Sequence, residues 1–243
     1  MAEQFEDYIT AINAAETAED AFGVIAKIAR EFGYDYVVYS LATDHPSLGL
    51  KRQHGLGDAY PEDWMKHYLA NNYIDIDPVF SEVVNSSVPF FWTSVIEKKP
   101  LASNSLRLMN EAEECGLREG LAVPLHGKGG EVAAVGLART EWTGERNYLD
   151  LAVFQFLSTY FHETYKNMIR PTAISLLTDR EREVLLWAAD GKTDLDISDI
   201  LCISQPTVRY RWNRIFEKLD VRGRVNAVTK AIRLGIITPQ AIR

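Results

Sequence analysis

Residues 195–219 read "LDISDILCISQPTVRYRWNRIFEKL" and decide the fold of the C-terminal part of the chain. The pattern predicts a short helix over 195–202, a turn of a few residues, and a longer helix over 205–219 that Ser204 caps. Two helices joined in this way form a helix-turn-helix motif. At 100° per residue, the inward face of the longer helix gathers apolar side chains within about 60° of one another: Val208, Trp212, Ile215 and Leu219.

The outward face of the longer helix is rich in groups that recognise nucleic acid. Arginine can donate two hydrogen bonds to guanine and asparagine can pair with adenine, so Arg209 and Asn213, one turn apart, are predicted to read neighbouring bases. Arg211, Arg214 and the earlier Lys192 are better placed for phosphates. The alternative is that these charged residues only form an exposed helix face that keeps the protein soluble. The DNA-contacting residues are expected to be Gln205, Arg209, Tyr210, Arg211, Asn213, Arg214 and Lys192.

The sequence on both sides of the motif is also helical. Thr178 is a predicted N-cap with Glu181 three places later, and Gly191 is a stop signal for the helix in residues 177–192. A fourth helix is predicted over residues 224–235. An all-α four-helix domain is therefore expected at the C-terminal end of the chain.

The N-terminal part combines strands with helices. A helix capped by Thr17 should end at Gly33, and residues 34–41 are β-branched and aromatic, as in a buried strand. A hairpin and a long amphipathic helix follow, in residues 121–127, 131–139 and about 147–168. The fold class predicted for the chain is therefore α/β, with an N-terminal α-β-α sandwich and the C-terminal helical domain.

Three segments are expected in the 243 residues: a first domain over 1–167, a linker over 168–175 that contains Pro171, and a second domain over 176–243. The net charge also differs between the two predicted domains. Residues 1–172 carry 14 Lys and Arg against 25 Asp and Glu, a net of −11, whereas residues 173–243 carry 12 against 9, a net of +3. A small, mildly basic module joined to an acidic body is compatible with DNA binding.

Composition excludes several other classes of protein. The chain is 47% hydrophobic, yet it has no stretch of the roughly 18–20 apolar residues that a membrane span needs. Its acidic N-terminus is not a signal peptide, and two distant cysteines, Cys115 and Cys202, indicate a reducing cytoplasm. We expect no metal, no cofactor and no enzyme, because the five histidines show no metal spacing and no catalytic set is visible: His45, His54, His67, His126 and His162.

The runs "YPEDWMKHY" (60–68) and "YIDIDPVF" (73–80) place several aromatics just before a carboxylate, Asp77. Tyr60, Trp64 and Tyr68 follow at i, i+4 and i+8, which predicts one helix face. Taken alone, the aromatics suit an ordinary core stripe and Asp77 suits a helix cap before Pro78.

Both halves of the chain resemble the LuxR family. "LTDREREVLLWAADGK", "ISDILCISQPTV" and "KAIRLGII", within residues 176–237, are similar to its DNA-binding domain, although Tyr210 and Trp212 are larger than is typical and leave the operator sequence open. Residues 1–165 resemble the autoinducer-binding domain of the quorum-sensing branch, on positions that match in order and spacing: Tyr60, Trp64, Tyr68, Asp77, Pro78, Trp92 and Gly120.

The resemblance implies an N-acyl-homoserine lactone ligand. Asp77 would accept a hydrogen bond from the ligand amide, Trp64 would donate to the lactone carbonyl, and Tyr60 would donate to the acyl carbonyl. Tyr68 and Trp92 would wall the head group and the start of the tail. Asp75 is expected to be solvated.

One departure from the family concerns a hydroxyl near positions 136–138, where relatives often carry Ser or Thr. Gly136 and Ala138 stand here instead, and Ser40 is a candidate substitute from another strand. The small side chains leave room for a bulky or long acyl chain, so the sequence leaves the length and substitution of the ligand tail open.

The resemblance also implies double-stranded DNA as a partner, read by a homodimer because two modules must meet two half-sites. The expected dimer contacts are the helix of 147–168, the N-terminal segment and residues 224–234, and RNA polymerase is a candidate further partner. Two alternatives stay open: a regulator that senses a different small molecule, and an anti-activator that forms heterodimers with a related regulator. Activation and repression also both remain open.

Overall fold

The structure, a computed structural model, describes residues 2–98, 100–169 and 177–238. The chain forms two compact units, one N-terminal and one C-terminal. Of the predicted linker, Met168 and Ile169 are the last residues of helix α7, and residues 170–175 lie outside the described part. The domain bounds given above stay a prediction.

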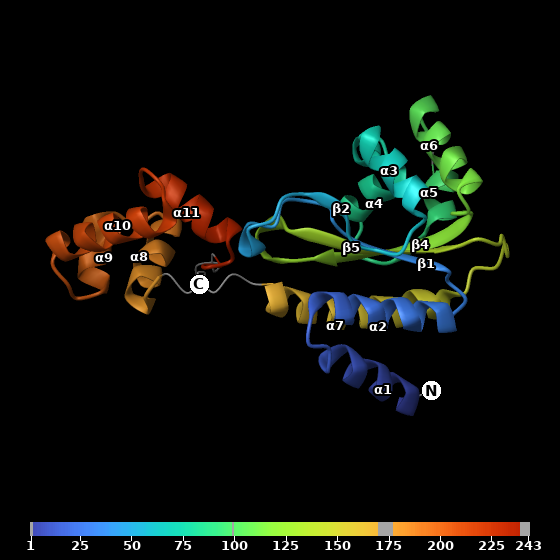
Figure 1. Cartoon of the computed structure of the whole chain (residues 1–243). Helices are drawn as coiled ribbons and strands as arrows, with labels where there is room; N and C mark the ends of the chain where they lie inside the picture. The colour runs from blue at the N-terminus through green and yellow to red at the C-terminus, as the bar shows by residue number, and fades with distance from the viewer. Residues whose placement is uncertain (1, 99, 170–176, 239–243) are drawn as a thin grey trace. The chain divides into compact units, whose positions relative to one another are not determined.

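A five-stranded antiparallel sheet organises the N-terminal unit, in the order β2-β1-β5-β4-β3 (Figure 1). The predicted strand and hairpin are its centre. The strand bounds are Tyr36–Leu41 for β1, Gln53–Asp58 for β2, Phe90–Phe91 for β3, Glu119–His126 for β4 and Val132–Arg139 for β5. Three short 3-10 helices interrupt the connections: Pro46–Leu48, Tyr73–Asp75 and Lys128–Gly130.

Helices cover both faces of this sheet, which confirms the predicted α-β-α sandwich (Figure 1). The helices on one face are α1 (Ala2–Asn13), α2 (Ala18–Glu31) and α7 (Tyr148–Ile169). Those on the other are α3 (Glu62–Ala70), α4 (Pro78–Asn85), α5 (Trp92–Lys98) and α6 (Ser103–Glu114). Each face has its own apolar cluster, one around Phe154 and Phe161, the other around Trp64 and Tyr68.

The sequence signals for the second helix behave as predicted. The Thr17 side chain accepts from the Asp20 N–H, and Asp20 accepts in return from the Thr17 N–H, a reciprocal capping box. The helix ends before Gly33, whose φ of +79° lies in the left-handed region that glycine adopts without strain. Local sequence alone therefore sets both ends of α2.

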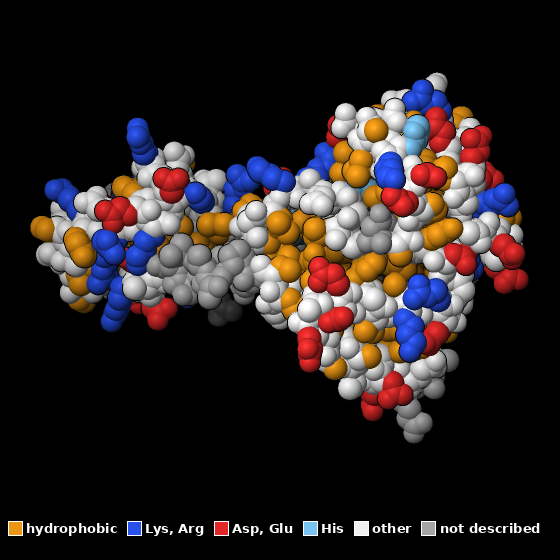
Figure 2. All heavy atoms as spheres, viewed as in Figure 1, with side chains coloured by type: hydrophobic (Ala, Val, Ile, Leu, Met, Phe, Trp, Pro, Cys, Tyr) orange, Lys and Arg blue, Asp and Glu red, His pale blue; other side chains and the backbone are white. Residues whose placement is uncertain are grey.

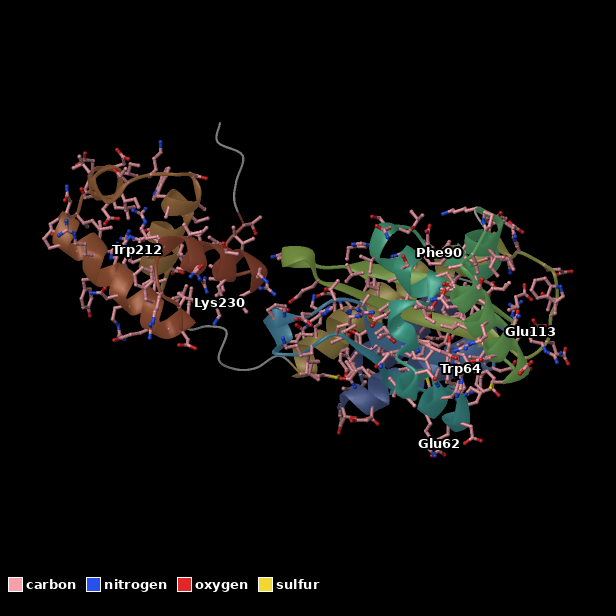
Figure 3. All side chains as sticks on the ribbon, turned by 90° about the horizontal axis from the view of Figure 1, so that it is seen from above. Glu62, Trp64, Phe90, Glu113, Trp212 and Lys230 are labelled. Atoms are coloured by element: carbon pink, nitrogen blue, oxygen red, sulfur yellow. The ribbon has the colours of Figure 1, made fainter. Side chains whose placement is uncertain are left out.

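The C-terminal unit consists, in its described residues, of α8 (Asp179–Ala189), α9 (Asp194–Ile200), α10 (Gln205–Leu219) and α11 (Arg224–Arg233). The four predicted inward side chains of α10 are all buried, and Trp212, labelled in Figure 3, is among them. Thr178 and Glu181 form the predicted capping box of α8. These findings confirm the all-α domain.

Two polar clusters fix the helix-turn-helix. Asp194 at the start of α9 accepts from Trp212 Nε1 at 3.1 Å and from Arg224 Nη1 at 2.9 Å, which joins α9, α10 and α11. Lys218 Nζ lies 2.7 Å from the buried Glu181 carboxylate and joins α10 to α8. Burial acts to raise the pKa of Glu181, but the hydrogen bonds from Lys218 and Thr178 outweigh it and leave that pKa below its usual value.

No helix in the described ranges combines the length and the apolar character that crossing a membrane requires.

Candidate ligand cavity and DNA-binding helix

A cavity lies in the N-terminal unit, between the sheet and the layer of α3 to α6, and the empty space within it, including solvent at its mouth, is about 590 Å³. Its walls are mostly apolar and include all six predicted ligand-binding residues: Ser40, Tyr60, Trp64, Tyr68, Asp77 and Trp92. The fold thus brings these residues together from separate elements, while their role in binding stays a prediction.

On the sheet face toward α3 to α6, paired residues form three successive rows across the strands, and the second and third rows form the floor of the cavity. The first row pairs Gly120 with Ala138, the second pairs Val38 with Gly136, and the third pairs Ser40 with Ala134. Neighbouring rows are two residues apart along a strand, or about 7 Å, because alternate residues face the same side. The small residues of this floor leave the space that the cavity occupies.

Aromatic side chains from the helical layer approach the first two rows closely. A Cβ on Gly120 would lie 2.6 Å from the Trp92 ring, so only glycine allows the indole to lie against β4. A Cβ on Gly136 would lie 3.1 Å from the Tyr60 hydroxyl oxygen. Trp92, which lines the cavity, therefore marks the first row of this sheet face, and the Tyr60 hydroxyl marks the second.

Tyr60 is not on the helix that the i, i+4, i+8 spacing predicted. Helix α3 begins at Glu62 after Pro61, so Tyr60 precedes it, while Trp64 and Tyr68 lie one turn apart within it. The prediction of a single helix face was wrong for this residue. All three side chains nevertheless line the cavity, and Trp64 and Tyr68 are almost fully buried. Figure 3 labels Trp64 in this layer.

Asp77 is both a helix cap and part of the cavity wall. Its Oδ1 accepts from the N–H groups of Val79 and Phe80 at 2.8 and 3.1 Å, which caps α4 before Pro78. Its Oδ2 accepts from the Tyr68 hydroxyl at 2.9 Å. A carboxylate oxygen has two lone pairs, so Oδ2 can accept one further hydrogen bond.

The surroundings of Asp77 shift its titration. Burial raises the pKa of the Asp77 carboxyl above its ordinary value, while the hydrogen bonds from Phe80, Tyr68 and Val79 act in the opposite direction. Burial likewise raises the pKa of Tyr68, whose phenol therefore stays protonated and donates. A further N–H donor would favour the ionised carboxylate.

Asp75, unlike Asp77, has an exposed side chain that lies outside the cavity lining. It ends a short 3-10 helix, its side chain is 65% exposed, and its carboxylate lies 3.0 Å from Arg52 Nη2. Asp75 is solvated, as predicted, and only Asp77 of the two lines the cavity.

His54 is a cavity residue that sequence reasoning missed. It lies on β2 and is only 9% exposed, and its Nδ1 is 2.8 Å from the Ser40 hydroxyl oxygen. Its ring packs on the Tyr68 ring with 4.4 Å between centroids. Pairing between β1 and β2 shifts register between Tyr39 and Leu41, and Gly55 has a φ of +73°. Such a bulge re-aims a neighbouring side chain, and a sequence pattern does not reveal it.

Trp92 carries an unused donor. Its Nε1–H is buried and has no hydrogen-bond partner within the part of the chain that the structure describes. A buried donor without an acceptor costs about 1–3 kcal/mol. This orphaned group is therefore available to an oxygen of a molecule in the cavity.

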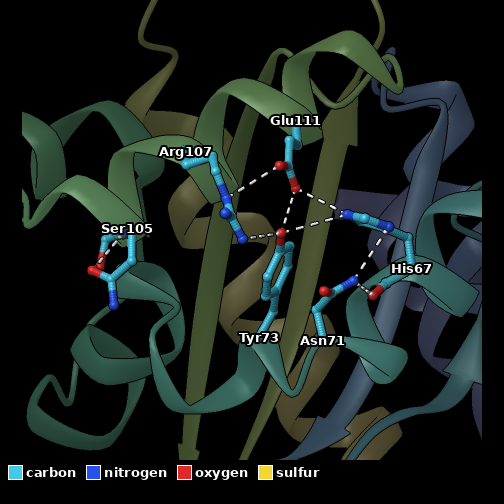
Figure 4. A network of polar contacts seen from close by, with 7 residues as sticks. His67, Asn71, Tyr73, Ser105, Arg107 and Glu111 are labelled. Atoms are coloured by element: carbon cyan, nitrogen blue, oxygen red, sulfur yellow. Dashed lines mark hydrogen bonds and ion pairs between the residues drawn. The ribbon is translucent and has the colours of Figure 1, made fainter.

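Helix α6, which the sequence did not predict, contributes Leu108, Met109 and Ala112 to the cavity. A polar network, drawn in Figure 4, ties its outer side to residues 67–73. The Tyr73 hydroxyl donates to Glu111 at 2.5 Å, and His67 Nε2 lies 3.0 Å from the same carboxylate. The Tyr73 hydrogen bond and His67 together hold the pKa of Glu111 below its usual value.

The predicted base-reading face of α10 is open. Arg209, Tyr210 and Asn213 are exposed, Tyr210 to 64%. Arg214 is exposed and pairs with Glu217 at 2.9 Å. Gln205, Lys192 and Arg211 are partly buried, and Arg211 Nη1 has no partner among the described residues. Figure 2 shows Lys and Arg side chains prominent on the visible face of this unit.

A sensor-like α/β unit with an internal cavity, followed by a helix-turn-helix unit, is the architecture of a ligand-responsive transcription regulator. Comparison with protein families agrees. Residues 17–165 match the autoinducer binding domain, and residues 175–231 match the bacterial regulatory proteins of the luxR family. The chain belongs to the LuxR family of transcription regulators with an autoinducer-binding domain, and it is not an enzyme.

Individual relatives extend over the whole chain. The transcriptional activator protein SolR of Ralstonia solanacearum is 33% identical over 98% of this chain and 100% of its own length. The quorum sensing-dependent regulator RpaR of Rhodopseudomonas palustris is 35% identical over 75% of this chain and 74% of its own. Among solved structures, Escherichia coli SdiA covers 98% of this chain and 99% of its own with a TM-score of 0.77 at 24% identity, a likeness of fold alone.

Proposed function

We propose that this protein binds an N-acyl-homoserine lactone in the cavity of its N-terminal unit and, as a homodimer, binds promoter DNA through α10. The observation that carries the proposal is the Asp77 carboxylate in an otherwise apolar and aromatic cavity wall. An apolar guest with one amide N–H satisfies both parts of that wall.

Each polar group of the lactone has a matching group in the cavity. The amide N–H would donate to Asp77 Oδ2, and the Tyr60 hydroxyl would donate to the acyl carbonyl. Trp64 would donate to the lactone carbonyl, while Tyr68 and Trp92 would enclose the ring. The orphaned Trp92 Nε1–H supports a ligand oxygen as an acceptor beside Trp92, over the first row of the sheet face.

Dimer formation has support from exposed apolar side chains. On α7, Phe156 is 42% exposed and Tyr160 38% exposed, and the Phe156 ring contacts the Phe5 ring of α1 at a tilted angle. On α11, Val225 is 78% exposed. These positions lie in the segments expected to meet a second copy, and a DNA target would place the dimer in the cytoplasm.

Thermal unfolding with a panel of lactones tests the proposal. A ligand that binds only the folded state stabilises it by about 2.7 kcal/mol at a hundred times its dissociation constant. At least one acyl-homoserine lactone, among linear, branched and aromatic tails, should raise the Tm in a dose-dependent way. If none does, a regulator that senses another small molecule becomes the better description; failure to bind any DNA would favour the anti-activator.

A further inference from the structure

The cavity floor contains one polar pair among small and apolar residues. His54 Nδ1 and Ser40 Oγ are 2.8 Å apart, and the Gly55 N–H donates to the same Oγ at 3.2 Å. Both side chains line the cavity and both are buried. The His54 Nε2 makes no hydrogen bond within the described ranges of the chain.

This pair offers one donor and one acceptor whichever way its proton lies. Burial lowers the pKa of His54 to about 4, so the imidazole is neutral near pH 7. If Ser40 donates to Nδ1, the free groups are Nε2–H and the second lone pair of Oγ. If Nδ1–H donates to Ser40 instead, the free groups are the hydroxyl proton and Nε2.

The position of the pair follows from the three rows on the sheet face toward α3 to α6. Trp92 marks the first row and the Tyr60 hydroxyl, next to Gly136, marks the second. Ser40 belongs to the third row, opposite Ala134. A lactone with its ring near Trp92 and its acyl carbonyl near Tyr60 therefore directs its tail toward Ser40 and His54.

We propose that Ser40 and His54 form a specificity site for a hydroxyl or carbonyl group on the acyl tail, about 7 Å beyond the acyl carbonyl. This inference rests on the proposed lactone-binding function and identifies the class of tail within it. A purely alkyl tail leaves one donor and one acceptor of the pair unpaired in the cavity, whereas a tail oxygen at this depth pairs with them.

Two matched ligands test the inference: N-hexanoyl-homoserine lactone and its 6-hydroxy derivative, whose terminal oxygen an extended chain carries to about that depth. The full-length wild-type protein should bind the hydroxylated ligand about 3- to 10-fold more tightly in a titration, the gain that one net hydrogen bond gives. His54→Phe should abolish or reverse this preference. His54→Gln, whose amide keeps a donor and an acceptor, should retain part of it.

The ratio of the two dissociation constants separates recognition from structure, because damage to the fold weakens both ligands alike. Should His54→Phe not fold, Ser40→Ala serves in its place and should shrink the ratio. Equal affinity of the wild type for both ligands, or an unchanged ratio in both variants, would overturn this inference alone. Binding of neither ligand, nor of any other lactone, would overturn the proposed function together with it.

Discussion

The Tyr68 hydroxyl donates a 2.9 Å hydrogen bond to Oδ2 of Asp77, while Oδ1 of the same carboxylate caps α4. The two oxygens thus have separate tasks. One stabilises a helix, and the other is held toward the cavity by an aromatic side chain that also lines it. A substitution that keeps the cap but changes the second oxygen can therefore isolate the ligand contact.

Asp77→Asn is that substitution. Asparagine is as good an N-cap as aspartate, so α4 should persist and circular dichroism should not change. The amide N–H₂ would face the ligand N–H, and the protein should lose its ligand-induced rise in Tm. Asp75→Asn is the control, because Asp75 is exposed and its ion pair with Arg52 lies at the surface. Equal loss of response in both variants, or in neither, would place the acceptor elsewhere.

Gly136→Ala should narrow the cavity next to the Tyr60 hydroxyl. The new Cβ would lie 3.0 Å from Val38 Cγ1 and 3.1 Å from that hydroxyl oxygen, so its neighbours must shift by a few tenths of an ångström. The affinity for lactones should fall, and it should fall most for ligands whose tails carry a branch or a ring near the acyl carbonyl. A ligand titration measures this change.

Gly23→Ala is the control for that substitution. No atom outside its own helix lies within 4 Å of a Cβ there, and Gly23 lies in α2, away from the cavity lining. It should raise stability by about 0.5–1 kcal/mol and leave affinity alone. Unchanged affinity in Gly136→Ala as well would mean that the tail does not cross the second row.

Stability should depend on pH through buried histidines. Burial lowers the pKa of His54 to about 4 and that of His162 to about 3, the latter helped by Lys166 and His45. The unfolded chain takes up these protons near pH 6.5, before the folded chain does. The stabilisation is complete above pH 6.5 and is lost progressively as the pH falls from there toward the folded-state pKa values.

Urea unfolding between pH 7 and pH 5 measures this loss. Each histidine should contribute up to about 1.4 kcal/mol per pH unit once the unfolded form is protonated. His54→Gln should remove one such contribution from the slope, and His162→Gln the other. A slope that neither variant changes would show that other groups govern acid unfolding.

Base reading and phosphate contact in α10 can be told apart. Arg209→Ala should cost about 1–3 kcal/mol per half-site and relax preference at one base position. Arg214→Ala should weaken binding to all sequences alike and reduce its salt dependence, because Arg214 is predicted to meet the backbone. Site selection with each variant and a salt titration on one operator measure both effects. If Arg214→Ala alone changes the selected sequence, the two roles must be exchanged.

Features that depend on neighbouring residues in the sequence were predictable from those residues, whereas the grouping of distant residues such as Ser40 and Trp92 in one cavity was predicted only through the family resemblance. Capping residues such as Thr17 and Thr178, and the hairpin of β4 and β5, are local signals that the structure confirms. Tyr60 was misplaced because Pro61 delays the helix start without disturbing the aromatic spacing.

His54 escaped prediction for a different reason. Its place in the cavity depends on the irregular pairing between β1 and β2, which unites residues 14 positions apart. Helix α6 likewise has mostly polar residues, and its cavity face becomes apparent only beside Tyr73 and the sheet. Residue spacing within one element could not reveal either feature.

The floor and the roof of the cavity come from different layers. Trp64, Asp77 and Trp92, the groups proposed to bind the lactone head, belong to the helical layer, whereas Ser40, His54 and Gly136, the groups proposed to meet the tail, belong to the sheet. Mutations on the strands can thus alter which tail is accepted while head-group recognition is inherited unchanged. A lineage carrying this fold can therefore change its specificity for the ligand tail through substitutions at a few strand positions, while the helical layer stays unchanged.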